Sequence, residues 1–325
     1  MAMLEIKGLK THFKTDDGWL HAVDGVDMAI DAGETLCVVG ESGCGKSVTA
    51  KTVLKLIDMP PGKIVAGQVL WQGRDLVPAT QDEMRKIRAK EIAIIFQEPM
   101  TSLNPVYEVG RQISESVRLH EGLSRAEAMN RAIEMLKLVG IPNPERRVGD
   151  YPHQFSGGMR QRVMIAIALA CNPKLLIADE PTTALDVTIQ AQILDLLAEL
   201  KDKFGMAIML ITHAMGVVAE VAQRVVVMYA GKVVEEASAI ELFANPKHPY
   251  TQGLIRSIPR IDTAATHKVR LEAIPGTVPK LIAPREGCRF AERCKYVTPK
   301  CHTATPPLLE VAPGHKVACI LHSAM

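Results

Sequence analysis

The feature that most constrains the fold is a glycine-rich segment, Gly40-Glu-Ser-Gly-Cys-Gly-Lys-Ser47, which directly follows the apolar run Thr35 to Val39. Its spacing, G-x-x-x-x-G-K-[ST], is typical of a turn between a buried strand and a helix, where backbone N–H groups point inward around phosphates. In such a turn Lys46 reaches the β- and γ-phosphates and Ser47 offers a hydroxyl to Mg²⁺. The predicted nucleotide-binding residues are Gly40, Glu41, Ser42, Gly43, Cys44, Gly45, Lys46 and Ser47.

The rest of the chain predicts alternating strands and helices. The first 30 residues favour two antiparallel strands, Leu4 to Phe13 and Leu20 to Ile30. Residues from about 112 to 139 have helical spacing, with Ser124 and Glu127 as a capping box. Further strands are expected at Leu175 to Ala178 and Ala207 to Ile211, and further helices at Ile189 to Lys201 and Met215 to Ala222. This alternation predicts an α/β fold with a parallel sheet.

Composition narrows the classes of protein. A chain of 325 residues is long enough for more than one core. Its net charge of +2 gives no reason to expect nucleic acid as a partner. No stretch approaches the roughly 18 apolar residues of a membrane helix, and no secretory signal is visible. We therefore expect a cytosolic protein with reduced cysteines.

A pair of acids follows another apolar run, Leu175-Leu-Ile-Ala-Asp179-Glu180. Asp179 suits the coordination shell of Mg²⁺, and Glu180 is placed to orient or deprotonate an attacking water. Such pairs are common after strands, so the pair is informative only together with the glycine-rich segment. The combination predicts a nucleotide hydrolase.

The segment Phe155-Ser156-Gly157-Gly158-Met159 decides among nucleotide hydrolases, because it resembles the signature sequence of ABC ATPases, with Met159 where glutamine is usual. Other elements of that family follow in order: Gln97, Ala184-Leu185-Asp186 and His213. The resemblance covers about residues 3–245. The Ser156-Gly157-Gly158 motif argues against a non-ABC kinase or a switch GTPase.

This resemblance implies roles for the residues that match. Ser156, Gly157 and Gly158 would bind the γ-phosphate of ATP held by an opposite subunit, so that a working site needs two cassettes. Gln97 would sense Mg²⁺ and water, and His213 would contact the γ-phosphate. Asp186 is placed among the ATP-binding residues. Phe13 aligns with the aromatic residue that stacks on adenine, the alternative being a core residue at a strand end.

One departure from the family concerns the residue after the histidine, where aspartate is usual and this chain has Ala214. The change is expected to weaken contacts at the dimer interface or to alter turnover. It leaves His213, Glu180 and Lys46 in place, so hydrolysis is still expected.

Longer segments resemble the ATPase subunits of dipeptide and oligopeptide (and related nickel) importers. These segments are Phe96-Gln-Glu-Pro-Met-Thr-Ser-Leu-Asn-Pro105, Tyr151-Pro-His-Gln-Phe-Ser156, Asp179-Glu-Pro-Thr-Thr-Ala-Leu-Asp186 and Pro246-Lys-His-Pro-Tyr-Thr251. The resemblance implies an ATP-hydrolysing subunit, peripheral on the cytoplasmic face of the inner membrane, that powers peptide import. Alternatives are an importer of nickel or another small solute, and a soluble ABC ATPase of translation or DNA repair.

The same resemblance implies an architecture and partners. Residues 1–245 would form the ABC nucleotide-binding domain, with a mixed RecA-like sheet core, an antiparallel β subdomain and a helical subdomain at about 98–150. Residues 246–325 would form a small extension containing cysteines. The partners would be a second cassette (a sister chain rather than a copy), two membrane permease subunits, and an extracytoplasmic peptide-binding protein acting indirectly.

Four of the seven cysteines lie in the last 40 residues, and the segments between them are five, six and seventeen residues long. Cys288, Cys294, Cys301 and Cys319 in a reduced compartment suggest a metal rather than disulfides. Zinc sites usually pair ligands at closer spacing, and the spacing matches neither ferredoxin pattern. The importer resemblance favours a [4Fe–4S] cluster, with zinc or unliganded thiols as alternatives. Three nearby histidines are alternative ligands or solvated surface residues: His302, His315 and His322.

Overall fold

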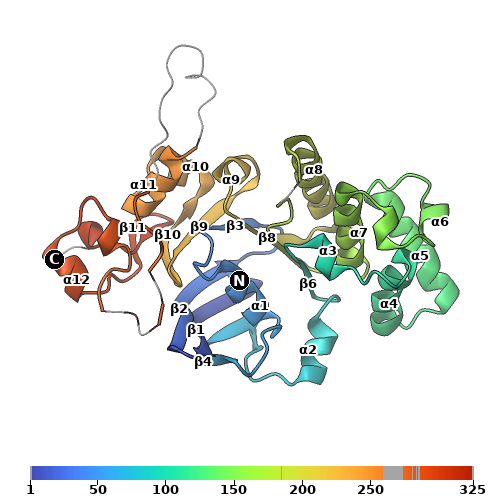
Figure 1. Ribbon diagram of the computed structural model, residues 1–325, viewed down its shortest axis with the longest axis horizontal. Helices are drawn as coiled ribbons and strands as arrows, with labels where there is room; N and C mark the ends of the chain where they lie inside the picture. Colours follow the sequence, from blue (N-terminus) through green and yellow to red (C-terminus); the bar gives the residue numbers. More distant parts are fainter. Residues whose placement is uncertain are drawn as a thin grey trace, which may run out of the picture. The chain divides into compact units, whose positions relative to one another are not determined.

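The structure is a computed structural model that describes residues 2–183, 185–258, 274–279, 281–282, 284 and 286–323. It divides into two compact units. The phosphate-loop unit comprises residues 1–30, 35–78 and 211–325, and the helix-rich unit comprises residues 31–34 and 79–210. Figure 1 labels the elements of both. Within the described residues no helix is both long and apolar enough to cross a membrane.

The phosphate-loop unit begins with an antiparallel sheet in the strand order β2-β1-β4-β5, coloured blue to cyan in Figure 1. Its strands are β1 (Leu4–Thr15), β2 (Gly18–Ile30), β4 (Gly62–Trp71) and β5 (Arg74–Asp75). The expected antiparallel pairing of the first two strands is confirmed, with Leu4 opposite Ile30 and Phe13 opposite Leu20.

The second sheet of this unit has the order β11-β12-β10-β9-β3. Its strands are β3 (Thr35–Val39), β9 (Arg224–Tyr229), β10 (Lys232–Ser238), β11 (Leu309–Ala312) and β12 (His315–Val317). Strand β3 is buried along its whole length and pairs with β9 in parallel, as expected for an apolar run without alternation. The helices are α1 (Lys46–Val53), α9 (Met215–Val221), α10 (Ala239–Ala244), α11 (Pro249–Arg256) and α12 (Pro299–Thr303), with short 3₁₀ turns at Ala291–Arg293 and Ile320–His322.

The helix-rich unit combines parallel strands with a group of helices that lie together in Figure 1. The strands are β6 (Ile92–Ile95), β7 (Leu175–Asp179) and β8 (Ala207–Thr212), whose last two residues belong to the phosphate-loop unit. The helices are α2 (Gln81–Ile87), α3 (Pro99–Ser102), α4 (Val109–Glu121), α5 (Arg125–Leu138), α6 (Pro144–Arg147), α7 (Gly157–Leu169) and α8 (Val187–Phe204), with a 3₁₀ turn at Pro152–Gln154.

The helical stretch expected at about 112–139 contains two helices, α4 and α5. They are separated at Gly122, which ends α4 in the left-handed region at φ 68°, a conformation that glycine adopts without steric cost. The capping box that begins α5 is confirmed, because the Ser124 side chain accepts from the backbone of Glu127.

The C-terminal extension packs as part of the phosphate-loop unit rather than as a unit of its own. Strand β12 joins the sheet through β10, with Val317 opposite Glu235. The division at residue 245, which the importer resemblance implies, stays a prediction.

Candidate active site

The glycine-rich segment forms a phosphate-loop turn between β3 and α1. Gly40 and Gly45 have φ values of 152° and 103°, where L side chains are strained. A Cβ atom on Gly40 would lie 2.2 Å from the Met228 carbonyl oxygen, and one on Gly45 would lie 2.4 Å from that of Ala22. Because both obstacles are backbone, no larger residue fits at either position.

Lys46 is buried inside the loop that it belongs to. Its ammonium donates to the carbonyl oxygens of Gly40 and Glu41, at 2.7 and 3.0 Å, and lies 3.7 Å from the Cys44 sulfur. Burial raises the pKa of the Cys44 thiol, which the Lys46 charge opposes. The site is therefore positively charged, while Ser42 and Gly43 at its tip are exposed.

The helix-rich unit brings together two residues that were predicted separately. Asp179 is buried at the end of β7, and Glu180 follows it in the left-handed region at φ 48°. The Gln97 amide donates to Oε2 of Glu180 over 2.9 Å, and the Thr183 hydroxyl donates to the same oxygen over 2.9 Å. Two donors thus fix the orientation of the carboxylate, and Thr183 was not foreseen from the sequence.

The signature segment begins helix α7, with Ser156 as its N-cap. The Ser156 hydroxyl accepts from the Met159 N–H over 3.4 Å, so Ser156, Gly157 and Gly158 share one helix start, as predicted. A Cβ atom on Gly157 would meet no atom within 4 Å, whereas one on Gly158 would lie 2.9 Å from the Ile189 side chain.

The remaining predicted site residues are Asp186, Phe13 and His213. Asp186 is the N-cap of α8 and accepts from the Ile189 N–H over 2.9 Å, while its neighbour Ala184 lies outside the described residues. Phe13 is half-buried at the end of β1. His213 is exposed after β8, and the N–H of Ala214 donates to the Thr212 hydroxyl over 3.0 Å.

The residues predicted to hold Mg²⁺ supply only hard oxygen ligands. Ser47 offers a hydroxyl, Gln97 an amide oxygen and the buried Asp179 a carboxylate. Magnesium prefers such oxygen donors and keeps several waters. The donor set therefore fits the ion.

Most of the contacts that surround Glu41 could not be predicted from the sequence. The Tyr250 hydroxyl accepts from the Glu41 N–H over 2.8 Å, and the Arg293 guanidinium binds the Glu41 carboxylate. Tyr250 lies in the recognised segment Pro246–Thr251, so that segment could have pointed to it.

One histidine interpretation was wrong. His315 is buried rather than solvated, and its Nε2 lies 2.8 Å from Oε1 of Glu235. Glu235 also accepts from the backbone of Lys247 and His248, at 2.6 and 3.0 Å. Burial lowers the pKa of His248 to about 3. These contacts connect the extension to β10, and the Nε2 atom of His315 is occupied by the Glu235 carboxylate.

The four clustered cysteines lie in one part of the extension and are buried or half-buried. Burial, with a smaller contribution from the charges of Cys301, Cys319 and Cys294, raises the pKa of Cys288 to about 11. In the described ranges no three of these sulfur atoms lie within 4.8 Å of one another. A four-thiolate zinc site, with Zn–S bonds of about 2.3 Å, needs sulfurs about 3.8 Å apart. The described sulfurs therefore lie farther apart than a four-thiolate zinc site requires.

Another group does have close ligand atoms: His12, His21 and Asp24, all within 4.8 Å. The two imidazole rings stack with centroids 3.9 Å apart. Three cations already neutralise Asp24, namely Lys10, Lys232 and Arg289. These charges oppose a divalent cation at this position.

The helix-rich unit also carries an open cleft of about 600 Å³ before and along α4. Val106, which is 69% exposed, lines it. The Arg111 guanidinium lies over the Tyr107 ring, 3.9 Å from its centroid. Apolar and cationic side chains thus share one concave surface, whose other lining residues include Glu115, Arg118 and Tyr151.

Two protein families match parts of the chain. The "ABC transporter" family matches residues 23–183, and the "Oligopeptide/dipeptide transporter, C-terminal region" family matches residues 234–301. Among solved structures, a dimeric ATP-binding cassette in a post-hydrolysis state with ADP and Pi aligns with a TM-score of 0.66 and 30% identity, over 73% of this chain and 99% of that one. These matches confirm the predicted ABC cassette fold.

Curated relatives match over nearly their whole length. A probable peptide ABC transporter ATP-binding protein of Sinorhizobium fredii is 55% identical over 98% of this chain and 94% of that protein. The oligopeptide transport ATP-binding protein OppD of Bacillus subtilis is 53% identical, over 98% and 89%. The dipeptide transport ATP-binding protein DppD of Escherichia coli is 48% identical, over 98% and 96%. With its phosphate loop, acidic pair and signature helix in place, the chain belongs to the ABC transporter family, among the ATP-hydrolysing subunits of peptide transporters.

Proposed function

We propose that this chain is the ATPase subunit that powers import of dipeptides or oligopeptides through an ABC transporter. The observation that carries the proposal is identity of 48–55% to peptide-transport ATP-binding proteins over 98% of the chain, extension included. A nickel or other small-solute importer remains the alternative, because this subunit does not contact the cargo.

Different residues are proposed to bind the phosphates, to hold Mg²⁺ and to activate the attacking water. The phosphate loop, residues 40–47, binds the phosphates, with Lys46 as its charge and Phe13 against adenine. Ser47, Gln97 and Asp179 would hold Mg²⁺, which would supply charge neutralisation at the phosphates. Glu180 orients the attacking water and accepts its proton as the water oxygen bonds to the γ-phosphorus. The bond from the γ-phosphorus to the β,γ-bridging oxygen breaks, and ADP and phosphate leave.

Several residues would act around the γ-phosphate. Gln97 holds the Glu180 carboxylate in its orientation, and His213 contacts the γ-phosphate. Ser156, Gly157 and Gly158, with Asp186, complete the site of a second cassette, because helix N-termini bind anions. The second cassette is proposed to be a sister chain.

The cleft along α4 is proposed to receive a helix of a membrane permease subunit. Its exposed Val106 and the Tyr107–Arg111 pair offer an apolar and a cationic contact on one concave surface. Two permease subunits and an extracytoplasmic peptide-binding protein would complete the importer. The chain would then lie peripherally on the cytoplasmic face of the inner membrane.

Cys288, Cys294, Cys301 and Cys319 are proposed to hold a [4Fe–4S] cluster, with zinc as the alternative. The support is the donor set, since four thiolates are the usual ligands of such a cluster. The cluster would fix the conformation of the extension.

The proposal is tested in vesicles that contain the chain, its sister cassette, the two permeases and the binding protein. ATP turnover is expected to rise when di- or oligopeptides are added with the binding protein, and labelled peptide is expected to accumulate. Stimulation by nickel and not by peptide would favour the alternative cargo. Co-purification with ribosomes or DNA in place of membrane proteins would contradict a transport function.

A further inference from the structure

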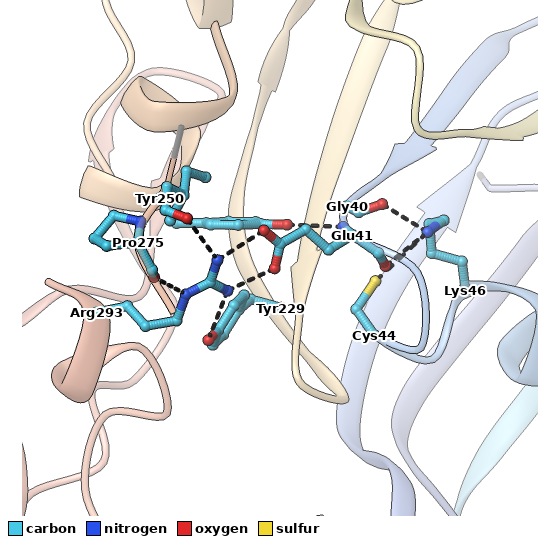
Figure 2. Close-up of polar contacts among 9 residues, drawn as sticks. Gly40, Glu41, Cys44, Lys46, Tyr229, Tyr250, Pro275 and Arg293 are labelled. Carbon is cyan, nitrogen blue, oxygen red and sulfur yellow. Dashed lines mark hydrogen bonds and ion pairs between the residues drawn. The ribbon is translucent and has the colours of Figure 1, made fainter. Parts of the chain in front are cut away.

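Arg293, one residue before Cys294, is bonded through its whole guanidinium (Figure 2). An arginine has five N–H donors, and all five are used here. Nε donates to the Pro275 carbonyl, Nη1 to the Glu41 carboxylate and the Tyr229 hydroxyl, and Nη2 to the Glu41 carboxylate and the Ile274 carbonyl. The two bonds to Glu41 are 2.6 and 2.9 Å long. The pair is therefore bidentate, and the Arg293 side chain is only 6% exposed.

Glu41 is the second residue of the phosphate loop, and it is held at three points. Its carboxylate binds Arg293, its N–H donates to the Tyr250 hydroxyl over 2.8 Å, and its carbonyl accepts from Lys46 over 3.0 Å. Figure 2 shows this chain of contacts from Arg293 through Glu41 to Lys46. Glu41 is therefore the single residue that links Arg293 to Lys46, the lysine that we place at the phosphates.

A second arginine of the same segment contacts the other side of the loop. Arg289, next to Cys288, donates to the Ala230 carbonyl and to Asp24. The next residue, Gly231, donates its N–H to the Cys44 carbonyl in the loop over 2.9 Å. The segment from Cys288 to Cys294 therefore contacts the loop's surroundings through both of its arginines.

Aromatic packing makes this connection stiff. Phe290, between the two arginines, meets the Tyr229 ring edge-on at 5.2 Å and the Tyr250 ring at 5.4 Å between centroids. Tyr250 is fully buried. Rings packed in this way cannot shift without displacing one another, so Arg293 is presented to Glu41 in a fixed position.

We propose that Arg293 is a positioning residue for the phosphate loop, through which the cysteine-bearing segment Cys288–Cys294 sets the affinity for ATP. Arg293 holds the Glu41 carboxylate, Glu41 holds its stretch of the loop, and the cysteines fix the backbone that carries Arg293. This inference rests on the ATP-binding role proposed above for the loop and Lys46.

The test measures the dissociation constant of a fluorescent ATP analogue for the full chain. Arg293→Ala and Glu41→Gln are each expected to raise it about tenfold, within the range of coupling between contacting residues. The double variant should be no weaker than either single variant, because both remove the same contact. Arg293→Lys should recover only part of the affinity, since lysine cannot bind a carboxylate in bidentate fashion. Lys316→Ala, which removes an ion pair to Glu236 elsewhere in the extension, should change nothing.

A second measurement separates positioning from general loss of structure. Hydrogen exchange of the Glu41 amide should accelerate in Arg293→Ala while exchange in α7 and the thermal unfolding temperature stay near those of Lys316→Ala. Cys294→Ser should weaken nucleotide binding in the wild-type background and add nothing to Arg293→Ala. Additive effects in either double variant would overturn the inference.

The outcomes also distinguish this inference from the function on which it rests. If Lys46→Ala abolishes nucleotide binding while Arg293→Ala stays within twofold of wild type, only the positioning role fails. If Lys46→Ala still binds nucleotide as the wild type does, the proposed ATP site itself fails and this inference fails with it.

Discussion

Gln97 and Glu180, 83 residues apart, are joined by a 2.9 Å hydrogen bond from the amide Nε2 to the carboxylate Oε2. The bond is charge-assisted, and such bonds are roughly twice as strong as neutral ones. It keeps the Glu180 carboxylate in one orientation before any water arrives. A general base that is already oriented loses less entropy in the transition state.

Glu180→Gln should bind ATP normally but turn over about 10²-fold more slowly or worse, because the amide keeps the shape and loses the basicity. The measurement is ATP hydrolysis by the assembled transporter, with nucleotide binding measured separately. The variant should also accumulate as a closed dimer that retains ATP. Glu199→Gln, at an exposed position of α8, serves as the matched control. Near-normal turnover in Glu180→Gln would show that another group handles the water.

Ser156→Arg should leave nucleotide binding by the isolated chain intact and abolish transport. The arginine would project from the start of α7, where a Cβ on the neighbouring Gly157 meets open space, and would block the approach of a second cassette. Turnover by the wild-type chain alone should rise with protein concentration. A purified monomer that hydrolyses ATP at a rate independent of concentration would contradict a shared site.

Val106→Asp should weaken co-purification with the permease subunits while ATP binding stays unchanged. The substitution places a carboxylate on the concave surface along α4, where burial against an apolar helix leaves a charge without water. Ile240→Asp, at an apolar position that is 86% exposed and lies outside the cleft, provides the control. Equal loss of permease in both variants would mean that the cleft is not the docking site.

Anaerobically purified protein should be brown, absorb broadly near 400 nm and contain about four irons per chain, as expected for one [4Fe–4S] cluster. Cys294→Ser should lose the colour and most of the iron. Cys171→Ala replaces a buried cysteine of the helix-rich unit. This variant should keep both the colour and the iron. A colourless protein with one zinc per chain would overturn the cluster but retain a metal-bound extension.

The free energy of unfolding should decrease as the pH is lowered below about 6.5, because His248 is buried in its neutral form. Burial lowers the pKa of His248 to about 3, so the unfolded chain binds a proton between these values and the folded chain does not. The free energy of unfolding is then complete above about pH 6.5 and decreases toward pH 3, by up to about 1.4 kcal/mol per pH unit. Urea unfolding at several pH values measures the slope. His248→Asn should reduce it, because asparagine does not titrate and still accepts the Tyr250 N–H, whereas the exposed His302→Asn should not.

The elements predicted well from the sequence are those whose signal is local. The phosphate loop, the Ser124 capping box and the Asp179–Glu180 pair each occupy a few consecutive residues, so composition and spacing define them. The contacts around Glu41 could not be predicted in this way, because Arg293 lies 252 residues away and pairs with it only through the fold. His315 was misjudged for the same reason, since its partner Glu235 is 80 residues away. The boundary between helices α4 and α5 is marked in the sequence only by the three residues 122–124, of which Ser124 already belongs to the capping box.

The same long separation between Glu41 and Arg293 has a consequence for biosynthesis. A ribosome adding about 5–20 residues per second needs roughly 13–50 s to pass from one to the other, and the partner strand of β3, which is β9, also emerges late. Residues 79–210 are all translated before residue 211, where the last stretch of the phosphate-loop unit begins. The nascent chain thus completes residues 79–210 first, and the nucleotide-binding turn acquires its contact with Arg293 only after a further 83 residues have been added.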